Sequence, residues 1–226
     1  MYLNNDPLQP SWRQFARRML LSACPRSLLI ADGPADKGLV WLTFDDGPHP
    51  EHTPRLLEAL HTCQIKASFF LIGAHAQQYP DLVREMVKQG HAIGYHTHDH
   101  ILPFAMSASD FSEDLRRGRK LLHTLAGRET AIFRPPRGKL TRSMLFRLWR
   151  DRQKVVLWNT DPKDYAMTSS EELRCWFADH PLASGDIVLL HEKHSFTAAI
   201  LPELVERTRS ANLDFASLDH PAIALT

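Results

Sequence analysis

Histidine stands out among the residue types that could do chemistry, because 13 of the 226 residues of the chain are histidines. His96 and His100 lie four residues apart in a histidine-rich stretch. Two imidazoles at this spacing reach one metal ion from a single turn, and a carboxylate from another strand completes a ligand set that leaves coordination positions open. Asp45 and Asp46 follow an apolar run and offer such a carboxylate. The pattern indicates a catalytic metal centre rather than a structural one.

Further ionisable residues occur where short apolar runs end, and we interpret these runs as strands. The residues at these ends are Asp45 and Asp46, His96 and His100, Arg134, Asp161 and Asp164, and His191. Active sites of parallel α/β proteins gather at the C-terminal edges of their strands. Solvated loop residues would have no reason to fall at the same end of each strand, so we expect these side chains to form one site.

The elements that must position these residues follow a regular alternation from Gly38 onward. We expect strands over residues 39–44, 67–72, 91–94, 132–134, 154–158, 187–190 and 214–217. Amphipathic helices lie between them, with Thr53 and Thr141 as expected helix caps. Roughly seven alternations with no break in composition predict a parallel α/β architecture in one domain over residues 38–226.

Composition restricts the partners of the protein. Lys plus Arg number 27 and Asp plus Glu number 26, so a net charge of +1 offers no global attraction to nucleic acid. The three cysteines are too far apart for a disulfide framework or a Cys-x-x-Cys zinc site, which suits a reducing compartment. No apolar run approaches the roughly 18 residues of a membrane span.

Residues 11–24 predict an amphipathic helix within an N-terminal extension over residues 1–37. Its apolar face carries Trp12, Phe15, Ala16, Met19 and Leu20. This face either packs against the main domain or lies on the anionic cytoplasmic leaflet, where nearby arginines would meet lipid phosphates. The apolar stretch between Arg18 and Cys24 is shorter than the about 7 to 15 residues of a signal peptide core. We therefore expect a cytoplasmic protein, with peripheral membrane contact through residues 11–24 as the alternative.

Five segments in order resemble the motifs of the polysaccharide deacetylase family, which shares the NodB homology domain and is grouped as carbohydrate esterase family 4. They are Thr-Phe-Asp-Asp-Gly-Pro at 43–48, His-Thr-x-x-His at 96–100, Arg-Pro-Pro-x-Gly at 134–138, Asp-x-x-Asp at 161–164 and Leu-Leu-His at 189–191. The resemblance implies a deformed (β/α) barrel of about seven parallel strands. It also implies metal-dependent removal of acetyl groups from saccharides.

Residue roles follow from the same resemblance. Asp46, His96 and His100 would hold a divalent metal, zinc first, with cobalt, nickel or iron as alternatives. Asp45 would be the general base toward water at the metal, and His191 would protonate the departing amine. Arg134 would hold Asp45 ionised, and Asp164 would keep His191 protonated. The implied substrate-binding residues are Pro135, Pro136, Arg137, Gly138, Asp161, Tyr165 and Leu189.

Three positions depart from the family pattern. Arg137 stands where Tyr is usual, Tyr165 where Trp is usual, and Tyr95 where Asn commonly precedes the first metal-binding histidine. None of these changes removes a metal ligand, the base or the acid, so we expect an active enzyme with an altered substrate pocket. Arg137 and Lys139 near the mouth favour an anionic group on the substrate, or they are simply solvated loop charges.

These residues favour a hydrolase that removes N-acetyl groups from an amino sugar in a glycan or a lipid-linked saccharide intermediate. A deformylase or an O-deacetylase would use the same reacting centre. A protein of another class, an inactive sugar-binding module on this fold, would be expected to have lost at least one of Asp45, Asp46, His96, His100 or His191, and all five are present.

Overall fold

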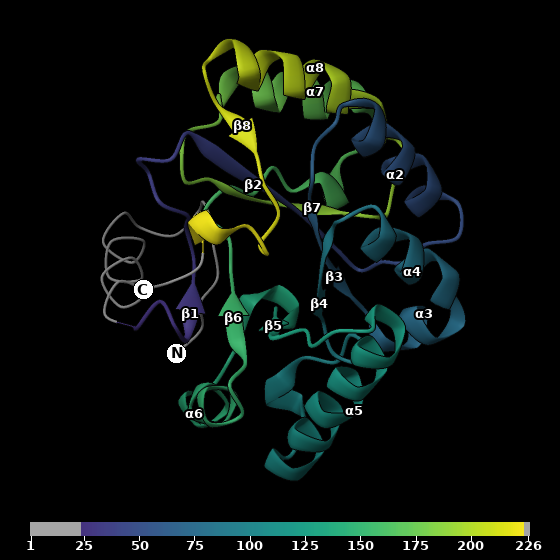
Figure 1. Cartoon of the computed structure of the whole chain (residues 1–226), viewed down its shortest axis with the longest axis vertical. Coiled ribbons are helices and arrows are strands. Elements are labelled where there is room, and N and C mark those ends of the chain that lie inside the picture. Colours follow the sequence, from purple (N-terminus) through teal and green to yellow (C-terminus); the bar gives the residue numbers. More distant parts are fainter. Residues whose placement is uncertain (1–23, 224–226) are drawn as a thin grey trace.

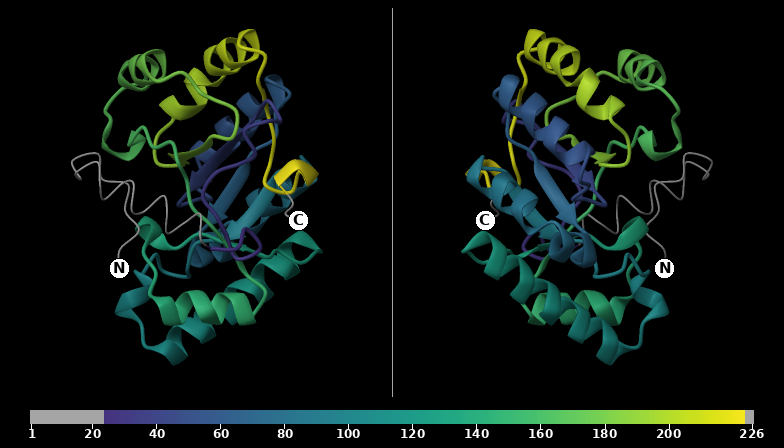
Figure 2. Two further views of the ribbon diagram at one scale, coloured as in Figure 1. Left: turned by 90° about the vertical axis from the view of Figure 1, so that its left-hand side faces the viewer. Right: turned by 90° about the vertical axis from the view of Figure 1, so that its right-hand side faces the viewer.

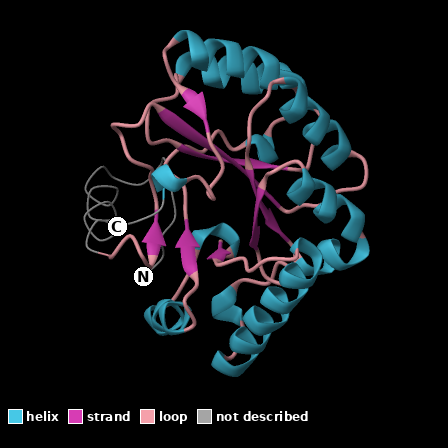
Figure 3. Cartoon of the chain, viewed as in Figure 1, coloured by secondary structure: helices cyan, strands magenta, loops and turns pink. Residues whose placement is uncertain are grey.

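Parallel strands at the centre and helices around them make up the computed structural model, which describes residues 24–223 (Figures 1 and 3). The strands are β1 Leu29–Ile30, β2 Leu39–Asp45, β3 Ser68–Leu71, β4 Ala92–Tyr95, β5 Ile132–Phe133, β6 Lys154–Val156, β7 Ile187–His191 and β8 Asp214–Phe215. They run in the order β1-β6-β5-β4-β3-β2-β7, and β8 pairs with β2. Within the described residues β1 and β7 do not pair, so the barrel is open between them, as expected of a deformed barrel.

Helices cover the outside of this sheet (Figure 2). They are α2 His52–Thr62, α3 Gly73–Gln78, α4 Pro80–Lys88, α5 Ala108–Ala126, α6 Arg142–Arg150, α7 Ser170–Asp179 and α8 Phe196–Ser210, with short 3-10 segments η1 Pro103–Ala105, η2 Pro136–Gly138, η3 Asp164–Ala166 and η4 Pro221–Ile223. No helix in residues 24–223 is both long enough and apolar enough to cross a membrane.

The expected strands from residue 39 onward are confirmed within a few residues, but β1 was not expected. It pairs in parallel with β6, through Leu29 opposite Val155, so the sheet begins before residue 38. A strand of two residues is too short to carry an alternation pattern. The helix expected over residues 11–24 falls almost entirely outside the described residues.

Of the two helix caps expected from the sequence, one is confirmed and the other is wrong. Thr141 caps α6 as expected, because its hydroxyl accepts from the Met144 N–H at 3.3 Å. Thr53 does not cap α2, which already begins at His52 after Glu51. The Thr53 hydroxyl instead accepts from the His49 N–H at 2.8 Å and donates to a carboxyl group of another segment. The Thr53 side chain therefore binds a residue distant in the sequence instead of capping its own helix.

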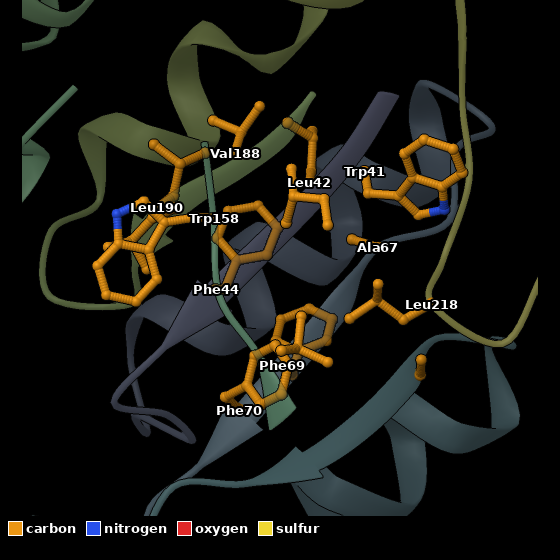
Figure 4. Close-up of a cluster of buried hydrophobic side chains, with 14 of the residues drawn as sticks. Trp41, Leu42, Phe44, Ala67, Phe69, Phe70, Trp158, Val188, Leu190 and Leu218 are labelled. Carbon is orange, nitrogen blue, oxygen red and sulfur yellow. The ribbon is translucent and has the colours of Figure 1, made fainter. Parts of the chain in front are cut away.

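Side chains of β2, β3 and β7 form the centre of the core (Figure 4). Phe44 and Phe69 stack with ring centroids 5.3 Å apart, and Trp41 is fully buried. Burying each such side chain contributes about 1.5–3 kcal/mol relative to leaving it exposed. This packing fixes the two adjacent strands on which Asp45 and His191 are the last residues.

Tyr95, the last residue of β4, is buried against α5. Its ring fills the space beside Gly118, where an added Cβ would lie 2.2 Å from a ring atom. The Tyr95 hydroxyl donates to Asp114 Oδ1 at 3.2 Å, and the His98 N–H donates to the same oxygen at 3.0 Å. Burial raises the pKa of the Tyr95 hydroxyl. Helix α5 thereby holds both sides of the segment that carries His96.

Candidate active site

The strand ends bring the predicted residues together at one edge of the sheet. Asp45 and His191 lie opposite each other in the register of β2 and β7. His96 follows β4, where its N–H donates to Leu71 O at 2.9 Å. Arg134 follows β5, and its N–H donates to Tyr95 O at 3.0 Å. Backbone hydrogen bonds of the sheet therefore position these side chains.

Arg134 is the most deeply embedded charge of the site, with a fully buried side chain. Its Nη1 donates to Asp45 Oδ1 at 2.8 Å and to Thr43 Oγ1 at 2.7 Å. Its Nε and Nη2 donate to Val156 O at 3.2 Å and Leu157 O at 3.1 Å. One guanidinium thus ties β2 to β6 and holds the Asp45 carboxyl in a fixed orientation.

Burial sets the proton affinity of the Asp45 carboxyl, whose side chain is 4% exposed. Burial raises the pKa of Asp45, and the positive charge of Arg134 opposes this shift. A carboxylate whose pKa lies above its ordinary value accepts a proton more readily than an exposed one. Asp45 is therefore suited to act as a base.

Asp46, His96 and His100 form a set of three groups whose ligand atoms all lie within 4.8 Å of one another. Asp46 Oδ1 lies 3.6 Å from His96 Nε2 and 3.3 Å from His100 Nε2. This oxygen is buried and has no hydrogen-bond partner among residues 24–223. An oxygen and two ring nitrogens that face one another without hydrogen bonds fit a bound cation.

The protonation of His96 also fits a metal ligand. Its Nδ1 is 2.7 Å from Arg134 O, which fixes the ring so that Nε2 faces Asp46. Burial lowers the pKa of His96 to about 3, so the imidazole is neutral. Asp46 and His100 are 32% and 39% exposed, which leaves one side of the centre open to solvent.

Three residues of this centre adopt left-handed backbone conformations although none is glycine. The φ angles are 72° at Asp46, 65° at Thr97 and 55° at His100. Such angles cost energy in non-glycine residues and concentrate at functional sites. The turn at Asp46 is further held by His75, whose Nδ1 lies 2.9 Å from Asp46 O.

His191 and Asp164 form a second polar pair. His191 Nδ1 lies 2.7 Å from Asp164 Oδ1, and the His191 N–H donates to Asp164 Oδ2 at 2.8 Å. Burial favours the neutral ring, but the hydrogen bond and charge of Asp164, aided by Asp45 and Asp46, outweigh it and raise the pKa of His191 to about 9. The ring is therefore protonated at neutral pH, with Nε2–H directed away from Asp164.

The expected substrate-binding residues are divided between surface and interior. Tyr165 is 44% exposed and presents its ring edge-on to His191, with centroids 5.2 Å apart. Arg137 is exposed on η2 with φ 56°. Pro135, Pro136 and Gly138 are buried around it. Leu189 is 4% exposed within β7, and Asp161 is half-buried and accepts from the Lys163 N–H at 2.9 Å.

Sequence reasoning missed two residues beside the site. Thr43 lies within the first motif, and its hydroxyl donates to Val188 O at 2.6 Å while accepting from Arg134. Glu192 is 3% exposed, and burial raises its pKa to about 8. An acidic residue directly after the apolar run that ends in His191 was the available signal for Glu192.

Comparison with known proteins identifies the family to which the chain belongs. Residues 32–150 match the polysaccharide deacetylase family. Over 202 residues the chain is 31% identical to a peptidoglycan-N-acetylglucosamine deacetylase of Bacillus cereus, covering 86% of this chain and 92% of that protein. Over 154 residues it is 34% identical to a chitooligosaccharide deacetylase of Azorhizobium caulinodans, covering 68% of this chain and 73% of that protein. The chain belongs to the polysaccharide deacetylase family of hydrolases.

Solved structures agree with the fold. A crystal structure of a peptidoglycan N-acetylglucosamine deacetylase in complex with 4-naphthalen-1-yl-N-oxidanyl-benzamide matches with a TM-score of 0.81 and 26% identity, over 87% of this chain and 92% of that one. A deacetylase solved with substrate matches with a TM-score of 0.74 and 30% identity, over 82% and 89% of the two chains. The expected NodB-like architecture is confirmed.

Proposed function

We propose that the protein hydrolyses the N-acetyl group of N-acetylglucosamine units in a glycan, using a divalent metal held by Asp46, His96 and His100. The observation that carries this proposal is the combination of three features in one site: an Asp/His/His ligand set, a buried carboxylate and a protonated histidine. Amide hydrolysis needs each of them.

Asp45 takes the role of base. Its carboxylate accepts a proton from the attacking water, and the fixed Arg134 guanidinium keeps the accepting oxygen in place. A divalent ion at the ligand set would polarise the acyl oxygen and make water more acidic near neutral pH. The left-handed turn at Asp46 sets the position of its carboxylate next to Asp45.

His191 takes the role of acid. Its Nδ1 is engaged by Asp164, so Nε2 is the atom that donates a proton to the departing nitrogen. An amine is a poor leaving group without that proton, whereas an alcohol needs it less. The raised pKa of His191 therefore favours an amide substrate over an O-acetyl ester.

The proposal also specifies the sugar unit of the substrate and the identity of the metal. Relatives that act on peptidoglycan and on chitooligosaccharides support an N-acetylglucosamine unit. The exposed ring of Tyr165 next to His191 offers a surface for a sugar ring. Zinc is our first choice of metal because two imidazoles and one carboxylate are ligands that it prefers.

Metal removal followed by a substrate panel tests the proposal. Chelator-treated protein, verified as metal-free, should lose turnover, and zinc should restore it, with cobalt, nickel and iron as comparisons. The panel contains N-acetylated, N-formylated and O-acetylated saccharides, and the N-acetylated ones should be hydrolysed fastest. Unchanged turnover by metal-free protein would contradict the mechanism, and a preference for formyl or O-acetyl groups would contradict the substrate.

Location stays a separate proposal. We propose a cytoplasmic protein in which the helix expected over residues 11–24 packs against the main domain, with peripheral contact between these residues and anionic lipid as the alternative. Co-sedimentation with anionic vesicles tests this contact on the full chain and on a variant with Arg13, Arg17 and Arg18 changed to Glu. Equal pelleting of the two proteins would contradict it.

A further inference from the structure

Glu192 lies directly beyond the last residue of β7, next to the turn that carries the metal ligand Asp46. Its side chain is almost fully buried, at 3% exposure of the residue. Its backbone N–H donates to Asp45 O at 3.1 Å, one step past the last paired residues of β2 and β7. The chain after His191 therefore continues alongside the Asp45–Asp46 segment.

The Glu192 carboxyl has two different environments at its two oxygens. Oε2 accepts a hydrogen bond from the Thr53 hydroxyl, which in turn accepts from the His49 N–H at 2.8 Å. Oε1 is buried without a hydrogen-bond partner in the described part of the chain. An added Cβ on Gly47 would lie 1.7 Å from Oε1, so this oxygen lies directly against the Gly47 backbone.

Gly47 owes its lack of a side chain to this contact. Gly47 does not have a positive φ, so the contact with the Glu192 carboxyl, and not a left-handed conformation, is what favours glycine here. Its carbonyl oxygen accepts from the Ile72 N–H at 3.0 Å. The turn after Asp46 is thus held from one side by the segment after β3 and from the other side by the Glu192 carboxyl.

We propose that Glu192 is a positioning residue of the metal centre: through its contact with Gly47 and its hydrogen bond to Thr53, it fixes the Asp46 turn relative to His191. The inference rests on the proposed function, in which Asp46 binds the metal. Glu192 itself is not one of the three clustered ligands. It acts on Asp46 through the backbone of the adjacent residue.

The charge state of Glu192 agrees with this role. Burial raises its pKa to about 8 against the effect of the Thr53 hydrogen bond, and Asp46 and Asp45 raise it further. A neutral carboxyl fills the space beside the turn without adding a third negative charge next to Asp45 and Asp46. A glutamine side chain has the same shape and is also neutral.

The first experiment measures zinc affinity by competition with a chromogenic chelator, together with urea unfolding of each variant. Glu192→Ala should weaken zinc binding roughly tenfold or more, the range found for residues that orient metal ligands. Glu192→Gln should bind zinc nearly as tightly as the wild type, because glutamine keeps the shape and the neutral charge. Gln153→Ala is the matched control, because Gln153 is equally buried at 3% but lies just before β6, away from the metal ligands. It should lose stability and keep its zinc affinity.

A second experiment tests the contact with Gly47, so the inference can be checked even if Glu192→Ala does not fold. Gly47→Ala should weaken zinc binding, because its methyl group collides with the carboxyl. The double variant Gly47→Ala with Glu192→Ala should bind zinc more tightly than Gly47→Ala, because the collision is removed. Thr53→Val should weaken zinc binding in the same direction as Glu192→Ala.

Two results would overturn the inference: a folded Glu192→Ala that binds zinc as tightly as the wild type, or a double variant that is no better than Gly47→Ala. Failure of the proposed function has a different signature, since the wild type itself would then bind no zinc at the site. In that case the inference falls together with the ligand assignment.

Discussion

The active site has a buried half and an open half, and they are built in different ways. Asp45, Arg134 and His96 have side chains no more than 4% exposed, and each is on or next to the end of a strand. Asp46 and His100 are about a third exposed and sit on left-handed turns. In the proposed mechanism the buried half holds the base Asp45 and the metal ligand His96, whereas the open half leaves one side of the centre accessible from solvent.

Removal of the Arg134 guanidinium from the buried half should have the largest effect on stability and turnover. Arg134→Met leaves Asp45 as a buried, unpaired carboxyl and removes the hydrogen bonds to Val156 O and Leu157 O. Breaking a buried ion pair costs about 3–5 kcal/mol of folding free energy. Urea unfolding measures this loss, and turnover should disappear with it. Arg137→Met on the exposed segment is the control and should change stability by no more than about 0.5 kcal/mol.

Variants of the two neighbouring carboxylates should differ in the amount of metal that they bind. Asp46→Asn should lose the metal, because Asp46 is proposed as a ligand. Asp45→Asn should keep the metal but lower kcat by about 10² to 10⁴, the usual contribution of a general base. Bound metal, measured by elemental analysis, distinguishes the two variants. The reverse pattern would mean that the roles of the two carboxylates are exchanged.

Truncation of the acid should affect one class of substrate more than another. His191→Ala should keep its metal and lower turnover of amides by about 10² or more. Activated esters should lose less, because their leaving groups need no proton. Rates for the two substrate classes measured on the same protein preparation check this expectation. An equal loss on both classes would contradict the role of His191 as acid.

The smallest effect concerns the pH dependence of stability of the metal-free protein. The pKa of His191 is raised to about 9 in the folded protein from 6.5, so its stabilising pair with Asp164 is fully present below pH 6.5 and is lost as the pH rises through 9. Asp164→Asn removes the hydrogen bond and the charge that raise this pKa most. The stability advantage of the wild type over the variant should therefore shrink as the pH rises from 6 to 10. If urea unfolding gave the same stability difference between wild type and variant at every pH, the pairing of a protonated His191 with Asp164 would be contradicted.

The parts of the fold and site that could be predicted from sequence are those encoded locally. Apolar runs that end in Asp45, His96 or His191 are visible in the chain, and parallel topology brings their ends together. The left-handed turn at Asp46 has no local signal, because glycine would be the ordinary choice there. The Thr53 hydroxyl was misjudged as a cap because its partner is 139 positions away in the sequence.

The pairing of Tyr95 with Gly118 has a consequence for the evolution of this chain. Tyr95 is one of the three departures from the family pattern described above, and its ring needs the missing side chain of Gly118 in α5. Either substitution alone is unfavourable: Tyr95→Asn would leave a void beside the helix, and Gly118→Ala would force the ring out. The two positions therefore form an epistatic pair. We expect a change at one position to be tolerated better when the other changes with it, and a design that grafts this segment should transfer both.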